Sequence, residues 1–305
     1  MPRPALFFFN EQDGPHLAET FGPTTLTQLR VLRAGVAMGL RDLSDERAQV
    51  VRALNDAGVP VTGWLLLPRD EGYFATHTNA DRVEAAYERF LAWTRAKALR
   101  FGGIGLDFEP DIRDLDRLME KPGRTLARWL LRRGRGARVA DALVRYRALV
   151  ARVKADGFTV ETYQFPTIVD DRQRGSRFWQ GTLGALDVAA DREVVMLYTS
   201  LLGLVGPSLL AGYAPHCRSV GVGSTGGGID PFPKLGWSEL ERDLVVAARS
   251  ASELFVFSLE GCLAQGFLPR LATVEWERPV VDPPPSVRFA GRAARFLIQQ
   301  LSRLG

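Results

Sequence analysis

Short runs of β-forming residues alternate with longer helical patterns along the 305-residue chain. Eight of these runs predict strands at residues 5–9, 31–38, 59–67, 101–108, 158–165, 194–199, 219–222 and 254–258. Apolar residues at helical spacing predict helices at 44–57, 79–99, 137–155, 238–251 and 287–304. Strands that alternate with helices are typical of βα units around a parallel sheet. Eight such units favour an α/β fold of the (β/α)8 type, the TIM barrel, over a doubly wound open sheet.

The chain shows no linker and no change of composition that would divide it, so we expect a single barrel domain over residues 1–305. The Pro-rich stretch 279–286 is interpreted as a rigid connector. It precedes a C-terminal helix at about 287–304, which would close the ring of helices. Apolar residues make up 46% of the chain and charged residues 24%, which is the composition of a folded protein with a large core.

Groups that form disulfides or bind metals are few. Cys217 and Cys262 are the two cysteines, so the sequence contains neither a disulfide framework nor a thiolate cluster. The histidines His16, His77 and His216 lie far apart and in no metal-ligand spacing. We therefore expect no metal and no other cofactor, which argues against metal-dependent hydrolysis.

Membrane segments are not indicated. No stretch approaches the roughly 20 apolar residues that a membrane-spanning helix needs, and the apolar run 5–9 is much shorter than the hydrophobic part of a signal peptide. We interpret this run as the first strand. The expectation is a cytoplasmic protein with no membrane partner, or a chain from which a signal peptide has been removed.

Positive charge is concentrated in one segment, although the net charge is only +4. A basic helix there could dock phosphates or an anionic surface, but we interpret the segment as a solvated helix face. No recognition motif accompanies the charge, so no nucleic-acid partner is expected. The glycine-rich run 221–228 could cradle a phosphate, yet it lacks a P-loop lysine and is interpreted as a flexible rim loop. The arginines of the basic segment are Arg124, Arg128, Arg132, Arg133, Arg135, Arg138, Arg145 and Arg147.

The fourth β-rich run carries the most informative pattern. Side chains alternate faces along a strand, so Asp107 and Glu109 lie on the same face as two glycines, Gly103 and Gly105. The apolar residues that alternate with them face the surrounding helices. In a barrel that face looks inward, where two carboxylates are costly unless they lie at the open, carboxyl end of the strand. Crowding one carboxylate against the other raises the pKa of one, which suits a general acid. The alternative is a pair of rim residues that cap a helix or pair with an arginine.

The sequence Gly-Gly-Ile-Gly-Leu-Asp-Phe-Glu at 102–109 resembles the fourth-strand motif of family 18 glycoside hydrolases, the chitinase-like barrels. That motif is written Asp-Gly-x-Asp-x-Asp-x-Glu. The resemblance implies that Glu109 is the general acid and that Asp107 is its partner, which in the family orients the substrate acetamido group. Gly102 and Gly105 stand where the family has aspartates, so the substrate-assisted chemistry of the family is not implied in its standard form.

Two more runs resemble strands of the same family. Val-Met-Leu-Tyr-Thr at 195–199 is similar to the sixth-strand Met-x-Tyr-Asp pattern, with Thr199 in place of the aspartate. The likeness makes Tyr198 a hydrogen-bond donor in the site. The run 254–261 resembles the end of the eighth strand, where the family has a tryptophan beneath the sugar; here Phe257 takes that place.

Further candidates follow or lie on other strands. Glu260 closes the eighth run and is either a second carboxylate of the site or a helix cap. Trp64 on the third run could stack a sugar ring, or it belongs to the core. The loop after that run carries Tyr73, Phe74 and His77, in a position where barrel loops often contact substrate.

Substrate-binding candidates also lie on the fifth run. Glu161 and Tyr163 share one face of the strand and Gln164 faces the other way, so only one of these sets can point inward.

These features lead to two hypotheses from different classes. The first is a glycoside hydrolase or related carbohydrate-active enzyme, in which Glu109 protonates the glycosidic oxygen and Asp107 or Glu260 assists. The alternative is a non-catalytic chitinase-like barrel that binds a saccharide or a protein partner. The presence of Glu109 favours the enzyme. A third class, an enzyme of phosphorylated or anionic substrates, depends on the glycine run and the arginines alone.

Overall fold

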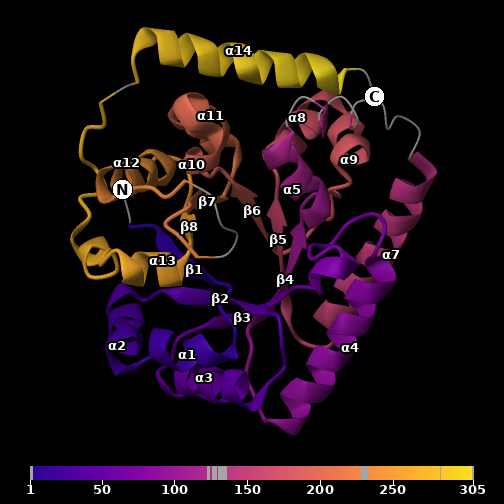
Figure 1. Ribbon diagram of the computed structural model, residues 1–305, viewed down its shortest axis with the longest axis vertical. Coiled ribbons are helices and arrows are strands. Elements are labelled where there is room, and N and C mark those ends of the chain that lie inside the picture. Colours follow the sequence, from indigo (N-terminus) through magenta and orange to yellow (C-terminus); the bar gives the residue numbers. More distant parts are fainter. Residues whose placement is uncertain are drawn as a thin grey trace.

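Eight parallel strands form a closed barrel in which each strand pairs with the next in the chain and β8 pairs with β1 (Figure 1). The computed structural model describes residues 3–121, 124–125, 129, 136–227, 233–281 and 283–303. The predicted (β/α)8 barrel is therefore confirmed. Its strands are β1 Ala5–Asn10, β2 Gly35–Leu40, β3 Val61–Leu65, β4 Gly103–Phe108, β5 Thr159–Gln164, β6 Arg192–Met196, β7 Ser219–Gly223 and β8 Glu253–Phe257.

Helices connect the strands and surround the barrel. Among the described residues, none of these helices is long and apolar enough to cross a bilayer. Before β6 they are α1 Gly14–Thr20, α2 Pro23–Leu32, α3 Asp45–Asp56, α4 Ala80–Ala96, α5 Ile112–Glu120, α7 Gly136–Ala155, α8 Thr167–Arg174 and α9 Phe178–Leu183. After β6 they are α10 Thr199–Leu202, α11 Gly206–Tyr213, α12 Trp237–Ala248, α13 Leu259–Ala264 and α14 Pro285–Ser302. Short 3-10 turns lie at Arg69–Glu71, before β6, and at Gly203–Val205, Ala214–His216 and Arg270–Thr273, after it.

The alternation of side chains on β4 divides two apolar layers, as its sequence predicts. Ile104, Leu106 and Phe108 are fully buried in the layer between the strands and the surrounding helices. A second, smaller layer fills the interior of the barrel with aromatic rings. There Phe9 packs edge-on against Trp64 at 5.2 Å between ring centroids. The interior is therefore packed below its mouth and is not a pore.

The second predicted strand was wrong at its start. Residues 31 and 32 end α2, a helix that the sequence pattern did not predict. Arg33 follows with a left-handed backbone (φ 51°), which ends the helix, and β2 begins at Gly35. The strand preference of the β-branched Val31 was thus overridden by the amphipathic helix α2, which buries Leu29 and Leu32.

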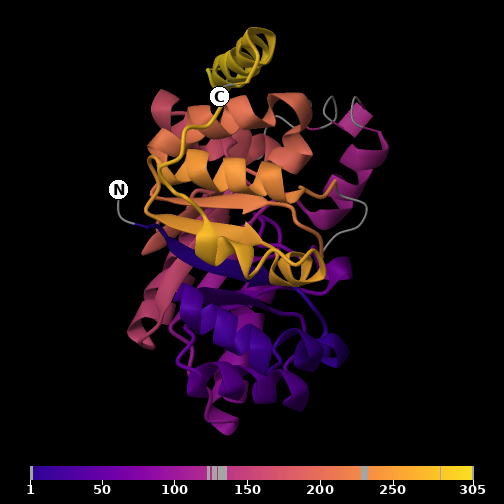
Figure 2. The same ribbon diagram turned by 90° about the vertical axis from the view of Figure 1, so that its left-hand side faces the viewer.

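The C-terminal helix α14 does not close the ring of helices, contrary to expectation. It crosses the outer side of α8, α9 and α11, as both views show (Figures 1 and 2). The short helix α13 follows β8 instead and contacts β1. Phe289, Phe296 and Leu297 of α14 stay exposed, so this helix adds little to the core.

Candidate active site

A cavity of about 650 Å³ lies at the carboxyl ends of the strands. Its floor combines aromatic side chains, including Phe9 and Trp64, with three carboxylates. Glu11 comes one residue after β1, Asp107 lies on β4, and Glu109 comes one residue after β4. Barrel enzymes place their reacting groups at this end, so the cavity is the candidate active site.

Asp107 is the most deeply buried of the three carboxylates, with 1% of its surface exposed. Its Oδ1 atom has no hydrogen-bond partner among the described residues. Burial holds the pKa of Asp107 well above its usual range, and the nearby Glu109 and Glu11 raise it further. Its environment therefore favours the protonated carboxylic acid over the ionised carboxylate.

Glu109 lies on the cavity wall with part of its side chain exposed. Burial, and then the neighbouring Glu11, raises the pKa of Glu109 to about 8. Its carboxyl group is consequently protonated near pH 7 and lies close to the pKa that suits general acid catalysis there. The alternative of an arginine-paired rim residue does not hold for Glu109, since no ion pair of this side chain is found in the described part of the chain.

Glu11 is the site residue that the sequence reasoning missed. Burial raises the pKa of its carboxyl group, whereas the Tyr73 hydroxyl, which donates a hydrogen bond to Oε1, and the charges of Arg41 and Arg69 oppose that rise. Of the three carboxylates, Glu11 thus has the best support for a negative charge. The pair Asn10-Glu11 directly after an apolar β-run was a usable signal, because polar residues at a barrel strand's carboxyl end face the mouth.

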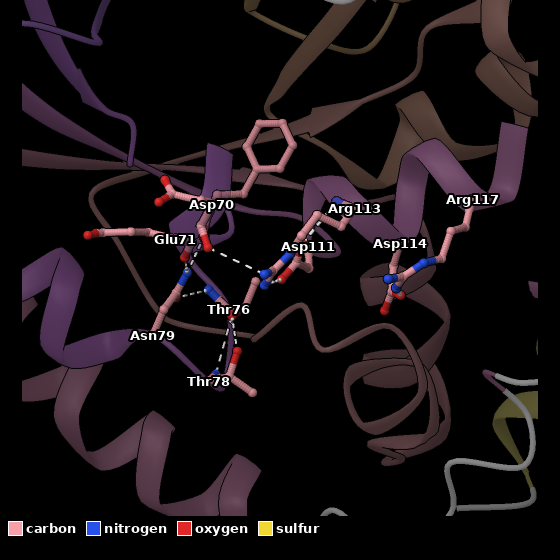
Figure 3. Close-up of polar contacts among 10 residues, drawn as sticks. Asp70, Glu71, Thr76, Thr78, Asn79, Asp111, Arg113, Asp114 and Arg117 are labelled. Atoms are coloured by element: carbon pink, nitrogen blue, oxygen red, sulfur yellow. Dashed lines mark hydrogen bonds and ion pairs between the residues drawn. The ribbon is translucent and has the colours of Figure 1, made fainter. Parts of the chain in front are cut away.

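The loop between β3 and α4 positions Tyr73 against Glu11. Tyr73 has a left-handed backbone (φ 66°), which is strained for a bulky residue and is common where a site fixes a side chain. Asn79 holds the loop, because its Nδ2 donates to the carbonyls of Glu71 (3.1 Å) and Phe74 (2.8 Å). Its Oδ1 accepts from the Thr76 amide at 2.8 Å (Figure 3).

The start of α5 braces the other side of this loop. Asp111 caps α5, its Oδ1 accepting from the Arg113 amide at 2.9 Å and from Arg113 Nε at 2.8 Å. Arg113 in turn donates to the carbonyl of Asp70 at 3.3 Å, so α5 and the β3–α4 loop are joined (Figure 3). The residues after Glu109 thereby help to fix the loop that carries Tyr73.

Tyr198 and Phe257 line the cavity opposite the loop. Their rings pack at 5.7 Å between centroids. Burial raises the pKa of the Tyr198 hydroxyl well above its usual range, as do the charges of Glu109 and Asp107, so it stays protonated. The neighbouring Thr199, at the place of the family's aspartate, points elsewhere and donates to Asp243 of α12.

Glu260 lies beside the site but does not line the cavity. It accepts from Asn10 Nδ2 at 2.9 Å and from the Glu11 amide at 3.2 Å, and so holds the end of β1 in place. Burial raises its pKa to about 7. It is not the cap of α13 either, because Ser258 caps that helix through its Oγ, which accepts from the Gly261 amide at 3.2 Å.

The predicted substrate-binding residues of β5 do not reach the cavity. Gln164 faces the helices and donates to the carbonyl of Leu186 at 3.1 Å. Glu161 and Tyr163 do point inward, but they lie deeper in the barrel, where Tyr163 donates to Glu161 at 2.9 Å. Glu161 also pairs with Arg192 at the start of β6. Their positions therefore correct the expectation for all three residues.

Tyr163 also accounts for one departure from the family motif. A Cβ atom added to Gly105 would lie 2.7 Å from Tyr163 Cε2, so no side chain fits there. The tyrosine hydroxyl occupies the space beneath Asp107 that a second aspartate would need. Gly102 is exposed before β4 begins, and nothing near it explains the loss of an aspartate.

The glycine run after β7 is packed rather than free in its described part. Thr225 is 1% exposed, and its amide donates to the Phe257 carbonyl at 2.7 Å. A Cβ atom added to Gly226 would meet the Lys234 side chain, and one added to Gly227 would meet Glu260. The expectation of a flexible rim loop is thus wrong for residues 221–227, while residue 228 lies outside the described residues.

The basic segment is described only in part, since Arg128, Arg132, Arg133 and Arg135 lie outside the described residues. Arg145 pairs with Glu84 of α4 at 2.5 Å on an exposed surface, as expected of a solvated helix face. Within the described ranges, no group of three or more His, Cys, Asp or Glu side chains could hold a metal ion.

Comparison with known proteins shows the fold. No family model and no curated protein matches the chain. A GH18 chitinase from Pseudoalteromonas aurantia is 7% identical, with a TM-score of 0.51 over 88% of this chain and 99% of that chain. The exo-β-1,4-mannosidase Op5Man5 from Opitutaceae bacterium strain TAV5 is 12% identical with a TM-score of 0.48; the match covers 98% of this chain but spans only 60% of the mannosidase. The PgaB (BpsB) glycoside hydrolase domain from Bordetella bronchiseptica is 14% identical, with a TM-score of 0.48 over 91% and 100% of the two chains. At 7% identity, the likeness to the chitinase shows the TIM-barrel fold and no activity.

Proposed function

We propose that the protein is a glycoside hydrolase in which Glu109 is the general acid. The observation that carries the proposal is the group of carboxylates in one cavity, in which burial and a neighbouring carboxylate raise the pKa of Glu109 to about 8. Glycosidases use two carboxyl groups in opposite states, one protonated and one ionised. The resemblance of residues 102–109 to a glycosidase motif supports the same role.

Glu11 is the second carboxyl group in this proposal, in place of Asp107 or Glu260. The hydrogen bond from Tyr73 and the charge of Arg41 favour its ionised form. Glu109 donates its proton to the glycosidic oxygen while the bond from that oxygen to the anomeric carbon breaks, and Glu11 stabilises the positive charge on the sugar. Water then adds its hydroxyl to the anomeric carbon. Its remaining proton goes to Glu11 if the configuration inverts, or to Glu109 if Glu11 first forms a covalent intermediate.

Asp107 and Tyr198 would then contact the sugar through hydrogen bonds, and burial raises the pKa of both groups, which favours their protonated, donating forms. Trp64 and Phe257 would provide apolar ring surfaces on the floor. Glu260 acts through the end of β1, where it orients Glu11. A cytoplasmic location and the absence of nucleic-acid and membrane partners stay predictions.

The experiment compares leaving groups in Glu109→Gln. Hydrolysis of methyl glycosides of glucose, mannose and N-acetylglucosamine should fall about a thousandfold, because an alkoxide leaves poorly without a proton. Hydrolysis of the 4-nitrophenyl glycosides should fall much less, because 4-nitrophenolate needs no proton. Glu46→Gln, an exposed carboxylate on α3, is the matched control. Equal losses for both leaving groups would contradict the role of Glu109 as acid.

The same experiment tests the non-catalytic alternative. A wild-type protein that binds these glycosides in calorimetry, and turns over none of them, is a saccharide-binding barrel. Proton NMR of the first product then decides between retention and inversion for an active protein.

A further inference from the structure

The wall of the cavity changes character from its floor to its mouth. Polar side chains that line it at the strand ends are the carboxylates, Tyr198 and Ser224. Toward the mouth, the described wall is built from α5, from the turn after β5 and from α10, which follow their strands and so stand farther out. Their lining side chains are apolar apart from one serine of α10 and comprise Leu115, Leu118, Phe165, Pro166, Leu201 and Leu202.

Two serines also line the cavity, but both are engaged by the protein itself. Ser200 Oγ accepts from the Ser224 amide at 2.7 Å, and Ser224 Oγ accepts from the Gly226 amide at 3.2 Å. They therefore tie β6 and β7 together at their ends. Apart from the O–H groups of these two serines, which can still donate, the side chains that can recognise a polar ligand are concentrated at the floor.

This division determines what kind of ligand fits. A sugar hydroxyl buried against leucine and proline side chains would lose its hydrogen bonds to water and gain none, which costs free energy. An alkyl chain in the same place gains from leaving water. Leu201 is 44% exposed at the rim, so the apolar surface reaches the solvent and a chain can enter there.

We propose that the substrate is an amphiphilic glycoside whose aglycone is an alkyl chain. This inference rests on the proposed hydrolase function. The sugar lies at the floor, with its glycosidic oxygen near Glu109, and the chain extends along Leu115, Leu118 and Leu202 toward the mouth. A cavity of about 650 Å³ is within the size range of sites for drug-sized ligands, and it leaves room for both parts.

The first test varies the chain at constant sugar. Methyl, butyl and octyl β-glycosides of glucose, mannose and N-acetylglucosamine are hydrolysed below their micelle concentrations, and kcat/KM is measured for each. For the sugar that is accepted, kcat/KM should rise about tenfold or more from methyl to octyl, since each buried methylene favours binding. Equal values for methyl and octyl would overturn the inference and leave the hydrolase function standing.

The second test changes residues of the cavity wall and keeps the ligands the same. Leu202→Ser and Leu118→Gln, on different helices, should each reduce the octyl-to-methyl ratio about threefold or more. Leu204→Ser is the matched control, because this leucine is 86% exposed and does not line the cavity. Thermal unfolding identifies a variant that has lost its fold. A ratio unchanged in both folded wall variants would contradict the proposed path of the chain.

Binding to Glu109→Gln separates the two proposals. Calorimetry compares octyl β-glucoside with methyl β-glucoside and with octanol. Tighter binding of the octyl glycoside than of either part, without turnover by the wild type, would refute the hydrolase and support an amphiphilic ligand. Octanol binding as tightly as the octyl glycoside would refute the glycoside as ligand.

Discussion

The two ends of the barrel interior surround their buried carboxylates with different partners. At the amino ends of the strands, Arg192 pairs with Glu161 and donates to Glu253 at 3.1 Å. Glu161 accepts further bonds from Thr62 at 3.1 Å and Tyr163 at 2.9 Å. At the carboxyl ends, Glu11, Asp107 and Glu109 lie together. Glu11 accepts from Tyr73, and no arginine or lysine pairs with any of the three among the described residues.

From this contrast we infer which carboxylates serve structure and which serve chemistry. Burial raises the pKa of Glu161 too, but Arg192 and the hydrogen bonds oppose that rise, whereas no cation opposes it at Asp107 or Glu109. Folding to a state in which Asp107 and Glu109 are crowded costs free energy that a merely structural role would not explain. This contrast supports the proposal that the carboxyl end of the barrel is the functional end and the amino end the stabilising one.

The largest effect is expected from Arg192→Met at the base. It leaves Glu161, with 1% exposure, and Glu253 without their cation, and it should lower the free energy of unfolding by about 3 kcal/mol. Arg172→Met is the matched control, because Arg172 also lies between two carboxylates, Asp187 and Glu193, but on the surface. Arg172→Met should lower the free energy of unfolding by about 1 kcal/mol or less, as measured by urea denaturation. Equal losses would remove the distinction between base and surface.

A smaller but opposite pair of effects is expected from Glu161→Gln and Glu109→Gln. At pH 8 the free energy of unfolding of Glu161→Gln should fall by about 2 kcal/mol, because Arg192 keeps its ion pair with Glu253 but loses the one with Glu161. In Glu109→Gln the free energy of unfolding should stay the same or rise by about 1 kcal/mol, because the substitution removes a carboxyl group whose ionisation is unfavourable in the fold. Urea denaturation of both variants measures this contrast. Loss of stability in Glu109→Gln would assign that residue to the structure.

The sequence predicted the barrel and the inward face of β4 because both depend on local periodicity. Alternating runs define βα units, and alternation within β4 places Asp107 opposite Ile104 and Leu106. Depth along the barrel axis does not follow from one strand. Glu161 lies at the base because the register sets it beside Arg192, the first residue of β6. Sequence spacing contains no such register.

Glu11 illustrates the other limit. Its partners Tyr73 and Glu109 lie 62 and 98 positions away in the chain, and only closure of the barrel brings them together. Polar residues that directly follow each strand could nevertheless have been gathered as one set, and Glu11 belongs to it. The alternation rule identifies such residues, and tertiary structure alone reveals which of them meet.

The free energy of unfolding should also depend on pH through the ionisation of Glu109. The folded pKa of Glu109, about 8, lies above its ordinary value of 4.5, so the folded state holds a proton that the unfolded state releases. Stability is then greatest below about pH 4.5 for this group and decreases as the pH rises to about 8. We expect a decrease of about 1 kcal/mol between pH 5 and pH 8, discounted for partial exposure, and a flatter profile in Glu109→Gln. A wild-type profile parallel to that of the variant would contradict the raised pKa.

The smallest effect expected is that of Tyr73→Phe, which tests which carboxyl group of the cavity is ionised. The hydroxyl of Tyr73 stabilises the ionised form of Glu11, so its removal raises the pKa of Glu11 further. The acidic limb of the kcat/KM profile should move to higher pH, with a loss of about fivefold at pH 6 and less at pH 8. Tyr146→Phe is the matched control, because the Tyr146 hydroxyl donates to the Thr76 carbonyl at 3.0 Å in the same loop, away from Glu11. A loop that is merely loosened would shift stability in both variants and the acidic limb in neither. A limb that moves in Tyr73→Phe alone identifies Glu11 as the ionised partner of Glu109.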